Sequence, residues 1–277
     1  MDLRSAVLGF RAHDRFVRHV TSAGLRPDVG SPAPVEEVEV RALPRPAQRY
    51  LRHMGTIGRP RDWSLTVRFR GGFRMKPGQS WMPFDAWQYN CTSPITRLVD
   101  MRIDAAGVVP MWGRDTYIAG RGRMIGKVLG LIPVADGQGT EFDRSELVTY
   151  LNDALMLAPS MLLVPAARWS HVDEHAFDIE LTDRGNGVSG RVFVDDSGRL
   201  VHFRTDDRWY AGVTPPVRTA WSTPVEGWTR SPAGRPVPTG GTAAWELPDG
   251  DFTYVRGAFV PSSLRVNVAP ELLGASL

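Results

Sequence analysis

Alternating apolar and polar positions recur through most of the chain and predict β-strands. In residues 63–70, for example, Leu65, Val67 and Phe69 alternate with polar side chains, as expected for a strand with one buried face. Similar runs, each bounded by Gly, Pro or Asp, occupy residues 80–90, 95–104, 108–119 and 122–134. The simplest arrangement of consecutive runs of this kind is an antiparallel meander.

A second series of strands in the latter half of the chain contains two hairpins. Its first turn is at Asp173-Glu174, and its second lies in residues 183–187, where turn-forming residues interrupt the alternation. The remaining runs occupy residues 188–194, 200–205 and the two sides of the segment LPDGDF. The pattern predicts about eleven strands in all.

One central segment, residues 143–158, has the spacing of a helix instead. Asp143 and Glu146 make a cap-like start, and Pro159 ends the helix. The apolar side chains recur every three or four positions, as on one helical face, at Leu147, Tyr150, Leu151, Ala154 and Leu155.

The first 60 residues are mostly helical by the same criterion. A helix over about 4–23 precedes a Pro/Gly-rich linker at 25–34, and two short helical pieces follow. No linker divides the strand-rich region. We therefore expect a single domain, composed of a helical segment (1–60) packed on the main body (61–270) and a tail (271–277).

The composition fits a globular protein of the mainly β, α+β class. Of the 277 residues, 42% are hydrophobic and 23% are charged, which supplies enough apolar surface for a core and excludes a disordered chain. The 28 Gly and 22 Pro favour many short strands and turns over long helical bundles.

Charge and targeting features exclude several classes of partner. The net charge is only +3, and the arginines are dispersed rather than clustered, so no nucleic-acid partner is expected. The chain contains neither an 18-residue apolar run nor a signal-peptide pattern at its beginning. We expect a cytoplasmic protein without stable membrane insertion.

Metal and cofactor motifs are weak. The single cysteine, Cys91, excludes an internal disulfide and any multi-cysteine metal site. His171, Glu174 and His175 match the H-x-x-E-H zinc motif, which requires a helix. Because these residues flank a predicted hairpin turn, their side chains should diverge. We expect neither a metal nor a cofactor.

The segment between Trp81 and Tyr89 is unusually rich in aromatic residues. Alternation places Trp81 on one face of its strand with Asp85, and Phe84 on the other face with Gln88. One face must belong to the core, and the other could line a ligand cleft, because pockets combine apolar walls with a few polar groups. Ordinary packing of aromatic side chains explains the pattern equally well.

Three other segments bring chemically useful side chains together. Asp115 and Tyr117 follow Arg114, and Asp207 precedes Arg208. Carboxylates beside arginine are expected to stay ionised, so ion pairing is the commoner explanation of both segments. On the central helix, Glu146, Tyr150 and Asp153 lie at adjoining positions, at spacings of four and three. If the helix lies across a concave sheet, Tyr150 and either Asn152 or Asp153 could point into a cleft, or equally to solvent.

Several motifs together resemble a bacterial family of unknown function. They are QRYLRHMGTIGRP, SWMPFDAWQY, SELVTYLNDALMLAPSMLL, VFVDDSGRLVHFRTDDRW, TPVEGW and AAWELPDGDFTY. The resemblance covers about residues 46–268 and implies a LolA-like, lipoprotein-carrier-like fold. In such a fold a curved antiparallel sheet of about eleven strands forms a half-barrel, and helices cover its open side. Proteins with similar half-barrels include lipid carriers and a cofactor-free enzyme of violacein biosynthesis, so fold alone does not choose a function.

Two functions remain open, and both use the cleft of the half-barrel. In the first, the protein binds a largely apolar or aromatic small molecule. The residues expected to contact this molecule are Trp81, Phe84, Gln88, Tyr150, Asn152, Trp169 and Trp221.

In the second, the protein is a cofactor-independent biosynthetic enzyme that steers a cyclisation, rearrangement or proton transfer. The candidate catalytic residues are Asp115, Tyr117, Glu146, Asp207 and Arg208. A protein-interaction module is a third interpretation. A homodimer is compatible with the sequence, which does not decide the oligomeric state.

Overall fold

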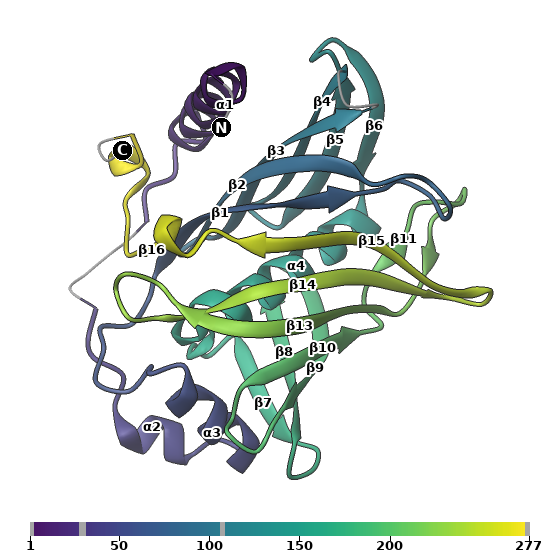
Figure 1. Cartoon of the computed structure of the whole chain (residues 1–277). Coiled ribbons are helices and arrows are strands. Elements are labelled where there is room, and N and C mark those ends of the chain that lie inside the picture. The colour runs from purple at the N-terminus through teal and green to yellow at the C-terminus, as the bar shows by residue number, and fades with distance from the viewer. Residues whose placement is uncertain (1–2, 28–31, 106–108, 275–277) are drawn as a thin grey trace.

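Antiparallel strands form one strongly curved sheet that dominates the molecule (Figure 1). The computed structural model describes residues 3–27, 32–105 and 109–274. Within these residues the sheet has thirteen strands in the order β6-β5-β4-β3-β2-β1-β15-β14-β13-β10-β9-β8-β7. The short strand β16 (Arg265–Val266) pairs with β1 outside this order.

The sheet consists of two meanders joined edge to edge by the pairing of β1 with β15. The first meander contains β1 (Ser64–Phe73), β2 (Met82–Thr92), β3 (Ile95–Ala105), β4 (Val109–Ile118), β5 (Arg121–Val128) and β6 (Ile132–Gln138). The second contains β7 (Ala167–His171), β8 (Ala176–Asp183), β9 (Asn186–Val194), β10 (Leu200–Thr205), β13 (Trp221–Arg230), β14 (Pro236–Leu247) and β15 (Gly250–Phe259).

Helix α4 (Thr140–Leu157) connects the two edge strands of the sheet, β6 and β7. It lies inside the curve of the sheet (Figure 1) and continues into a short 3-10 helix, η1 (Pro159–Leu162). Because a helix placed there meets strands on more than one side, most of its residues are buried. The predicted half-barrel with a central helix on its open side is therefore confirmed.

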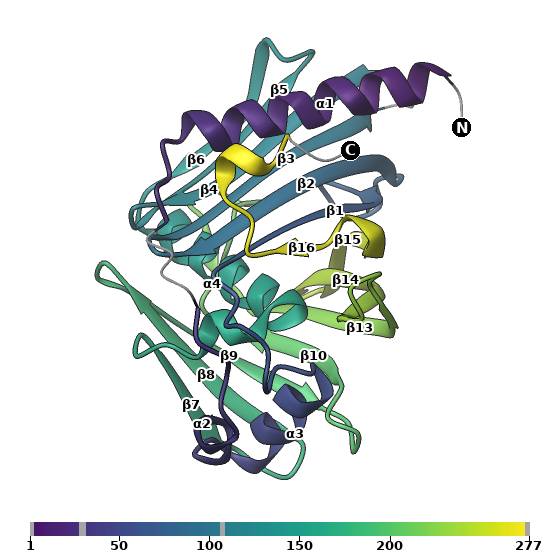
Figure 2. The same ribbon diagram turned by 90° about the vertical axis from the view of Figure 1, so that its left-hand side faces the viewer.

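The other helices lie outside the curve. Helix α1 (Leu3–Ser22) runs along the outer face of β2 and β3 (Figure 2), where Phe16 and Val20 pack against Trp87 and Tyr89. Helix α3 (Arg45–His53) lies beside β7 and β8, and α2 (Glu37–Arg41) packs on α3. Two 3-10 turns, η2 (Pro261–Ser263) and η3 (Pro270–Leu272), follow the last long strand. Of the expected tail, Leu273 is buried against α1, and 275–277 lie outside the described residues.

The main core lies between α4 and the second meander. Leu147, Leu151 and Leu155 of α4 pack into a cluster that includes Phe177 and Phe203 of the sheet. In addition, the Tyr50 hydroxyl of α3 donates a hydrogen bond to the Leu155 carbonyl. One end of α4 is thereby fixed to both the sheet and the N-terminal helices. No helix in the described residues is long and apolar enough to cross a membrane.

Two local predictions were wrong. Residues 122–134 form two strands, because Leu129 and Gly130 adopt positive φ values of 53° and 72° and reverse the chain within a continuous apolar run. Helix α4 begins at Thr140 rather than Asp143, with Gly139 as its N-cap. The Asp143 carboxylate instead accepts a hydrogen bond of 2.7 Å from the Gly122 backbone N–H.

The second meander also has one strand more than expected. The prediction placed one strand before LPDGDF, whereas β13 and β14 both precede it and form a hairpin. Proline and glycine residues break the alternation there, and the pairing contains register shifts near Gly227. The hairpin at Asp173-Glu174 is confirmed, since β7 pairs with β8 across it.

Candidate functional site

A cavity of about 700 Å³ lies between the concave face of the sheet and α4. Strands of both meanders contribute to its wall, which is mainly apolar. Representative apolar residues of the wall are Phe69, Val99, Met101, Met111, Trp221 and Phe252. The volume lies in the range of pockets that hold small organic molecules.

Helix α4 turns its polar face toward the cavity. Ser145, Glu146, Thr149, Asn152 and Asp153 line it and recur at helical spacing. The opposite face belongs to the main core. Both faces of the helix are therefore buried, and the polar one requires partners on the sheet.

Arg97 of β3 supplies the main partner of this polar face. Its Nη1 atom lies 2.8 Å from Glu146 Oε2, and its Nε atom lies 2.7 Å from Asp153 Oδ2. Gln88 of β2 also donates a hydrogen bond of 2.6 Å to Asp153. All four side chains are buried. A buried guanidinium thus holds two carboxylates, an arrangement that is stable only while every member is present.

Asp115 of β4 faces the same cavity but does not form the expected ion pair with Arg114. The neighbouring Arg114 lies on the other face of the strand, where it forms a salt bridge of 2.9 Å to Asp100. Arg114 therefore does not hold Asp115 ionised. In the described residues no hydrogen bond to the Asp115 carboxyl is present. Burial raises the pKa of Asp115, although Arg97 and Arg208 oppose the effect.

Glu146 is the second group with a strongly altered acidity. Burial, reinforced by the nearby Asp115 carboxylate, raises the pKa of Glu146 to about 7. A carboxyl whose pKa lies near 7 exchanges its proton in the physiological pH range. Glu146 is therefore the one group of the described cavity wall with a pKa suited to donating or accepting a proton near neutral pH.

Arg208 places a cation on the opposite wall. Its guanidinium carbon lies 4.3 Å from the ring centroid of Trp221 and 5.1 Å from that of Trp245. Its Nη1 atom lies 3.4 Å from the Tyr254 hydroxyl. Within the described residues it pairs with no carboxylate. The buried Nε atom has no hydrogen-bond partner there either.

Asp207 has a different role from its neighbour, because it fastens the chain that carries Arg208. Its carboxylate forms salt bridges of 2.7 Å to Arg218 and 3.0 Å to Arg144, and accepts hydrogen bonds from Ser189. These contacts fix the start of a small hairpin, β11 (Trp209–Tyr210) with β12 (Val217–Arg218). Residues of this hairpin line one side of the cavity.

Six of the twelve candidate residues lie in the cavity wall: Gln88, Asp115, Glu146, Asn152, Arg208 and Trp221. Asn152 accepts a hydrogen bond of 3.0 Å from Thr223, which links α4 to β13. Tyr117 lies elsewhere and closes the half-barrel at one end, because its hydroxyl donates to Asp183 at 2.8 Å. Asp183 belongs to β8, near the opposite edge of the sheet.

The remaining aromatic candidates lie outside the cavity wall. Phe84 is buried beneath the wall and packs edge-on against Phe69. Trp81 lies between the guanidinium groups of Arg74 and Arg256, each 4.5 Å from its ring. Trp169 stacks on Phe177 in the core.

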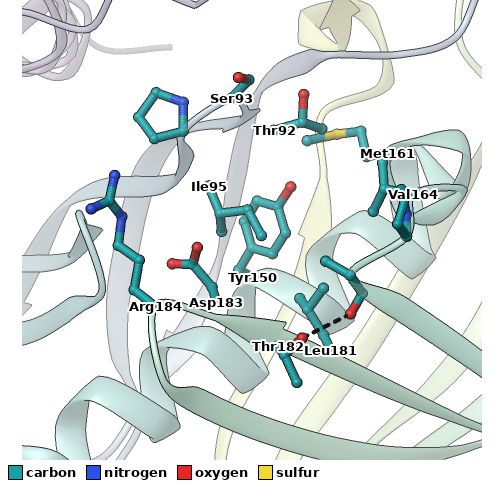
Figure 3. A pocket seen from close by; sticks show the side chains of 13 residues that line it. Thr92, Ser93, Ile95, Tyr150, Met161, Val164, Leu181, Thr182, Asp183 and Arg184 are labelled. Carbon is teal, nitrogen blue, oxygen red and sulfur yellow. Dashed lines mark hydrogen bonds between the residues drawn. The ribbon is translucent and has the colours of Figure 1, made fainter.

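Tyr150 faces a second, smaller pocket of about 370 Å³, shown in Figure 3. Its ring extends from α4 toward Ile95 and Met161, and Thr92 and Asp183 also line this pocket. The Tyr150 hydroxyl is buried and has no hydrogen-bond partner among the described residues. Burial raises the pKa of Tyr150 well above its ordinary value, so this side chain stays neutral.

The sequence argument missed Arg97, Trp245 and Tyr254. Arg97 could have been suspected, because it alternates with Val99 and Met101 on an inward face. A charged residue on such a face needs a buried partner of opposite charge. The contacts of Trp245 and Tyr254 depend on strand pairing, which no local pattern reveals.

The model of a family of unknown function (DUF6544) matches residues 33–257. The chain belongs to this family. The expected relationship to a family of unknown function is thereby confirmed. A search of curated proteins gave no match.

A search of solved structures matched chains at low sequence identity, among them the following three. One is a domain provisionally described as an outer membrane lipoprotein-sorting protein, from Vibrio parahaemolyticus (11% identity, TM-score 0.45, covering 85% of this chain and 97% of that one). Another is a DUF1329 family protein from Desulfovibrio piger (13% identity, TM-score 0.42, covering 76% of this chain and 90% of that one). The third is a β-barrel-like DUF1849 protein from Brucella abortus (10% identity, TM-score 0.25, covering 75% of this chain and 99% of that one). At TM-scores below 0.5, these likenesses carry no argument about function.

Replacing Arg97 with methionine tests the buried charge cluster. The change leaves Glu146 and Asp153 as unpaired buried carboxylates, so we expect the free energy of unfolding to fall by about 3–5 kcal/mol in urea denaturation. Asp153→Asn added to this variant should restore part of the loss. As a control, Arg191→Met removes a half-exposed pair with Asp178 and should cost less than about 1 kcal/mol. If Arg97→Met and Arg191→Met lower the free energy of unfolding equally, Arg97 does not hold a buried charge cluster.

The raised pKa of Glu146 predicts a specific dependence of stability on pH. With a folded pKa of about 7 against an ordinary value of 4.5, the folded protein holds a proton that the unfolded chain releases. The contribution of Glu146 to the free energy of unfolding is fully present below the pKa of the unfolded chain. It is lost as the pH rises through 7.

When the pH rises from about 5.5 to about 8, the free energy of unfolding of the wild type should therefore fall by about 2 kcal/mol more than that of Glu146→Gln. Glu141→Gln, at an exposed position of the same helix, serves as the control and should behave as the wild type. An identical pH profile for wild type and Glu146→Gln would show that Glu146 has no raised pKa.

Proposed function

We propose that the protein binds a largely apolar small molecule in the cavity between α4 and the concave face of the sheet. The observation that carries the proposal is the cavity itself, of about 700 Å³. Its wall combines many apolar side chains with a few fixed polar groups, which is the usual composition of a ligand pocket. A concave, mainly apolar space of this size is suited to a small organic molecule.

The polar groups supply orientation to such a ligand. Gln88 and Asn152 are already held by hydrogen bonds to neighbouring side chains, so their positions are fixed before a ligand enters. Fixed groups lose little side-chain entropy on binding. The apolar walls would provide most of the affinity, because burying apolar surface is favourable by roughly 25 cal/mol per Å².

A cofactor-independent enzyme that uses the same cavity is the second candidate. It is favoured by one observation: Asp115 and Glu146 both line the cavity as buried carboxyls with raised pKa values, and the pKa of Glu146, about 7, suits proton transfer near neutral pH. The reaction would be a cyclisation, rearrangement or proton transfer on a bound biosynthetic intermediate. Glu146→Gln would then abolish turnover and preserve binding, whereas a carrier has no turnover to lose. Location in the cytoplasm and homodimer formation stay predictions.

Filling the cavity tests the proposal directly. Gly113 of β4 lines the cavity, and a Cβ added there would meet only the Met101 Cβ atom, at an ordinary 3.6 Å. Gly113→Leu should therefore fold normally and occupy part of the space. We expect it to weaken binding of the uncharged dye Nile red, measured by fluorescence titration, by about tenfold or more, a loss of about 1.4 kcal/mol.

Gly187→Leu is the matched control. Gly187 lies at the start of β9, outside the cavity wall, and a Cβ there meets only Thr182 at 3.8 Å. This variant should bind the dye as the wild type does. Equal dye binding by wild type and both variants would place the dye elsewhere and contradict the proposal. Native mass spectrometry of freshly purified protein would identify any ligand that remains bound.

A further inference from the structure

We propose that the ligand carries an anionic head group, a carboxylate, that binds the guanidinium of Arg208 while its apolar body lies along the cavity wall. This inference rests on the proposed function and deepens it by naming the chemical class of the ligand. It depends on three features of Arg208, which are its missing partner, its rigid support and its permanent charge.

The first feature is the missing partner. Arg97, a buried arginine of the cavity wall, binds two carboxylates. Arg208, in contrast, forms no ion pair within the described residues, and its only hydrogen bond there is the long contact to Tyr254. Its Nε atom is buried without a partner in the same residues. An arginine guanidinium matches a carboxylate with two parallel hydrogen bonds, so Arg208 has the donors that such a group needs.

The second feature is rigid support. The guanidinium stacks on the rings of Trp221 and Trp245, and Trp221 donates a hydrogen bond of 3.1 Å to the Tyr254 hydroxyl. The preceding residue, Asp207, is fixed by salt bridges and by hydrogen bonds from Ser189. The cation is thus held in place before a ligand arrives, which lowers the entropic cost of binding.

The third feature distinguishes an anionic ligand from a cationic one. The Asp115 carboxyl also lacks a hydrogen bond among the described residues, and it could in principle receive an amine. A buried carboxyl, however, can lose its charge by taking up a proton, whereas a guanidinium stays charged at any physiological pH. An anion can form the direct hydrogen-bonded pair that Arg208 lacks within the described residues. The aromatic and apolar surroundings of Arg208 therefore select a carboxylate attached to an apolar body.

Three probes with the same alkyl chain and different heads test this inference. They are dodecanoate, dodecanol and dodecylamine, each used to displace Nile red at concentrations below the onset of micelles or of phase separation. We expect dodecanoate to bind about tenfold tighter than dodecanol, because a charge-assisted hydrogen bond contributes more than a neutral one. Arg208→Met keeps an apolar side chain against the two indoles and should remove this preference, whereas Arg208→Lys should retain part of it.

Arg256→Met provides the matched control. Arg256 also stacks on a tryptophan, Trp81, but it is exposed and does not belong to the cavity wall. This variant should keep the preference for dodecanoate.

Three outcomes would overturn the inference. If dodecylamine binds tightest, the anchor is Asp115 and the ligand is a cation. If dodecanol and dodecanoate bind equally, and Arg208→Met changes nothing, the anionic head is refuted while the cavity remains a site for apolar molecules. If no probe displaces the dye and Gly113→Leu leaves dye binding intact, both the inference and the proposed function fail.

Discussion

The pairing of Arg97 with Glu146 and Asp153 allows a polar helix to lie inside a curved β-sheet. Carboxylates lose their hydration when they are buried, and only an opposite charge with good hydrogen-bond geometry compensates that loss. The contact distances of 2.7 and 2.8 Å meet this requirement. Without the arginine, α4 would have to turn its polar face toward water.

The cavity follows from this placement of α4. Its apolar face packs into the main core with the second meander, while its polar face lines the cavity and is tied to the first meander through Arg97 and Gln88. The hairpin of β11 and β12, which Asp207 fastens, lines one side of the cavity. Buried charges therefore determine both the position of the helix and the composition of the cavity wall.

Local sequence patterns predicted the fold class well, because periodicity reports which face of an element is buried. The spacing of Leu147, Leu151 and Leu155 identified the central helix, and alternation identified most strands. Strand number was underestimated where Gly and Pro interrupt β13 and β14, and where the turn at Leu129 lies within an apolar run. Turn geometry of that kind has no apolar-polar signature.

The site was predictable only in part, because its contacts join residues far apart in the chain. Glu146 was identified from its place on the helix, but its partner Arg97 depends on how α4 lies over β3. Arg208 was expected to pair with its neighbour Asp207. The structure instead pairs Asp207 with Arg144 and Arg218, since consecutive side chains point in different directions.

A crystal structure with a bromine-terminated dodecanoate would test the central claim most directly. Anomalous scattering locates the bromine independently of the protein phases, and the carboxylate is seen at the other end of the same molecule. We predict the carboxylate at Arg208, between the positions of Trp221 and Trp245, and the bromine among apolar residues of the cavity such as Met101. A bromine on the outer surface of the sheet, or a carboxylate distant from Arg208, would contradict this account.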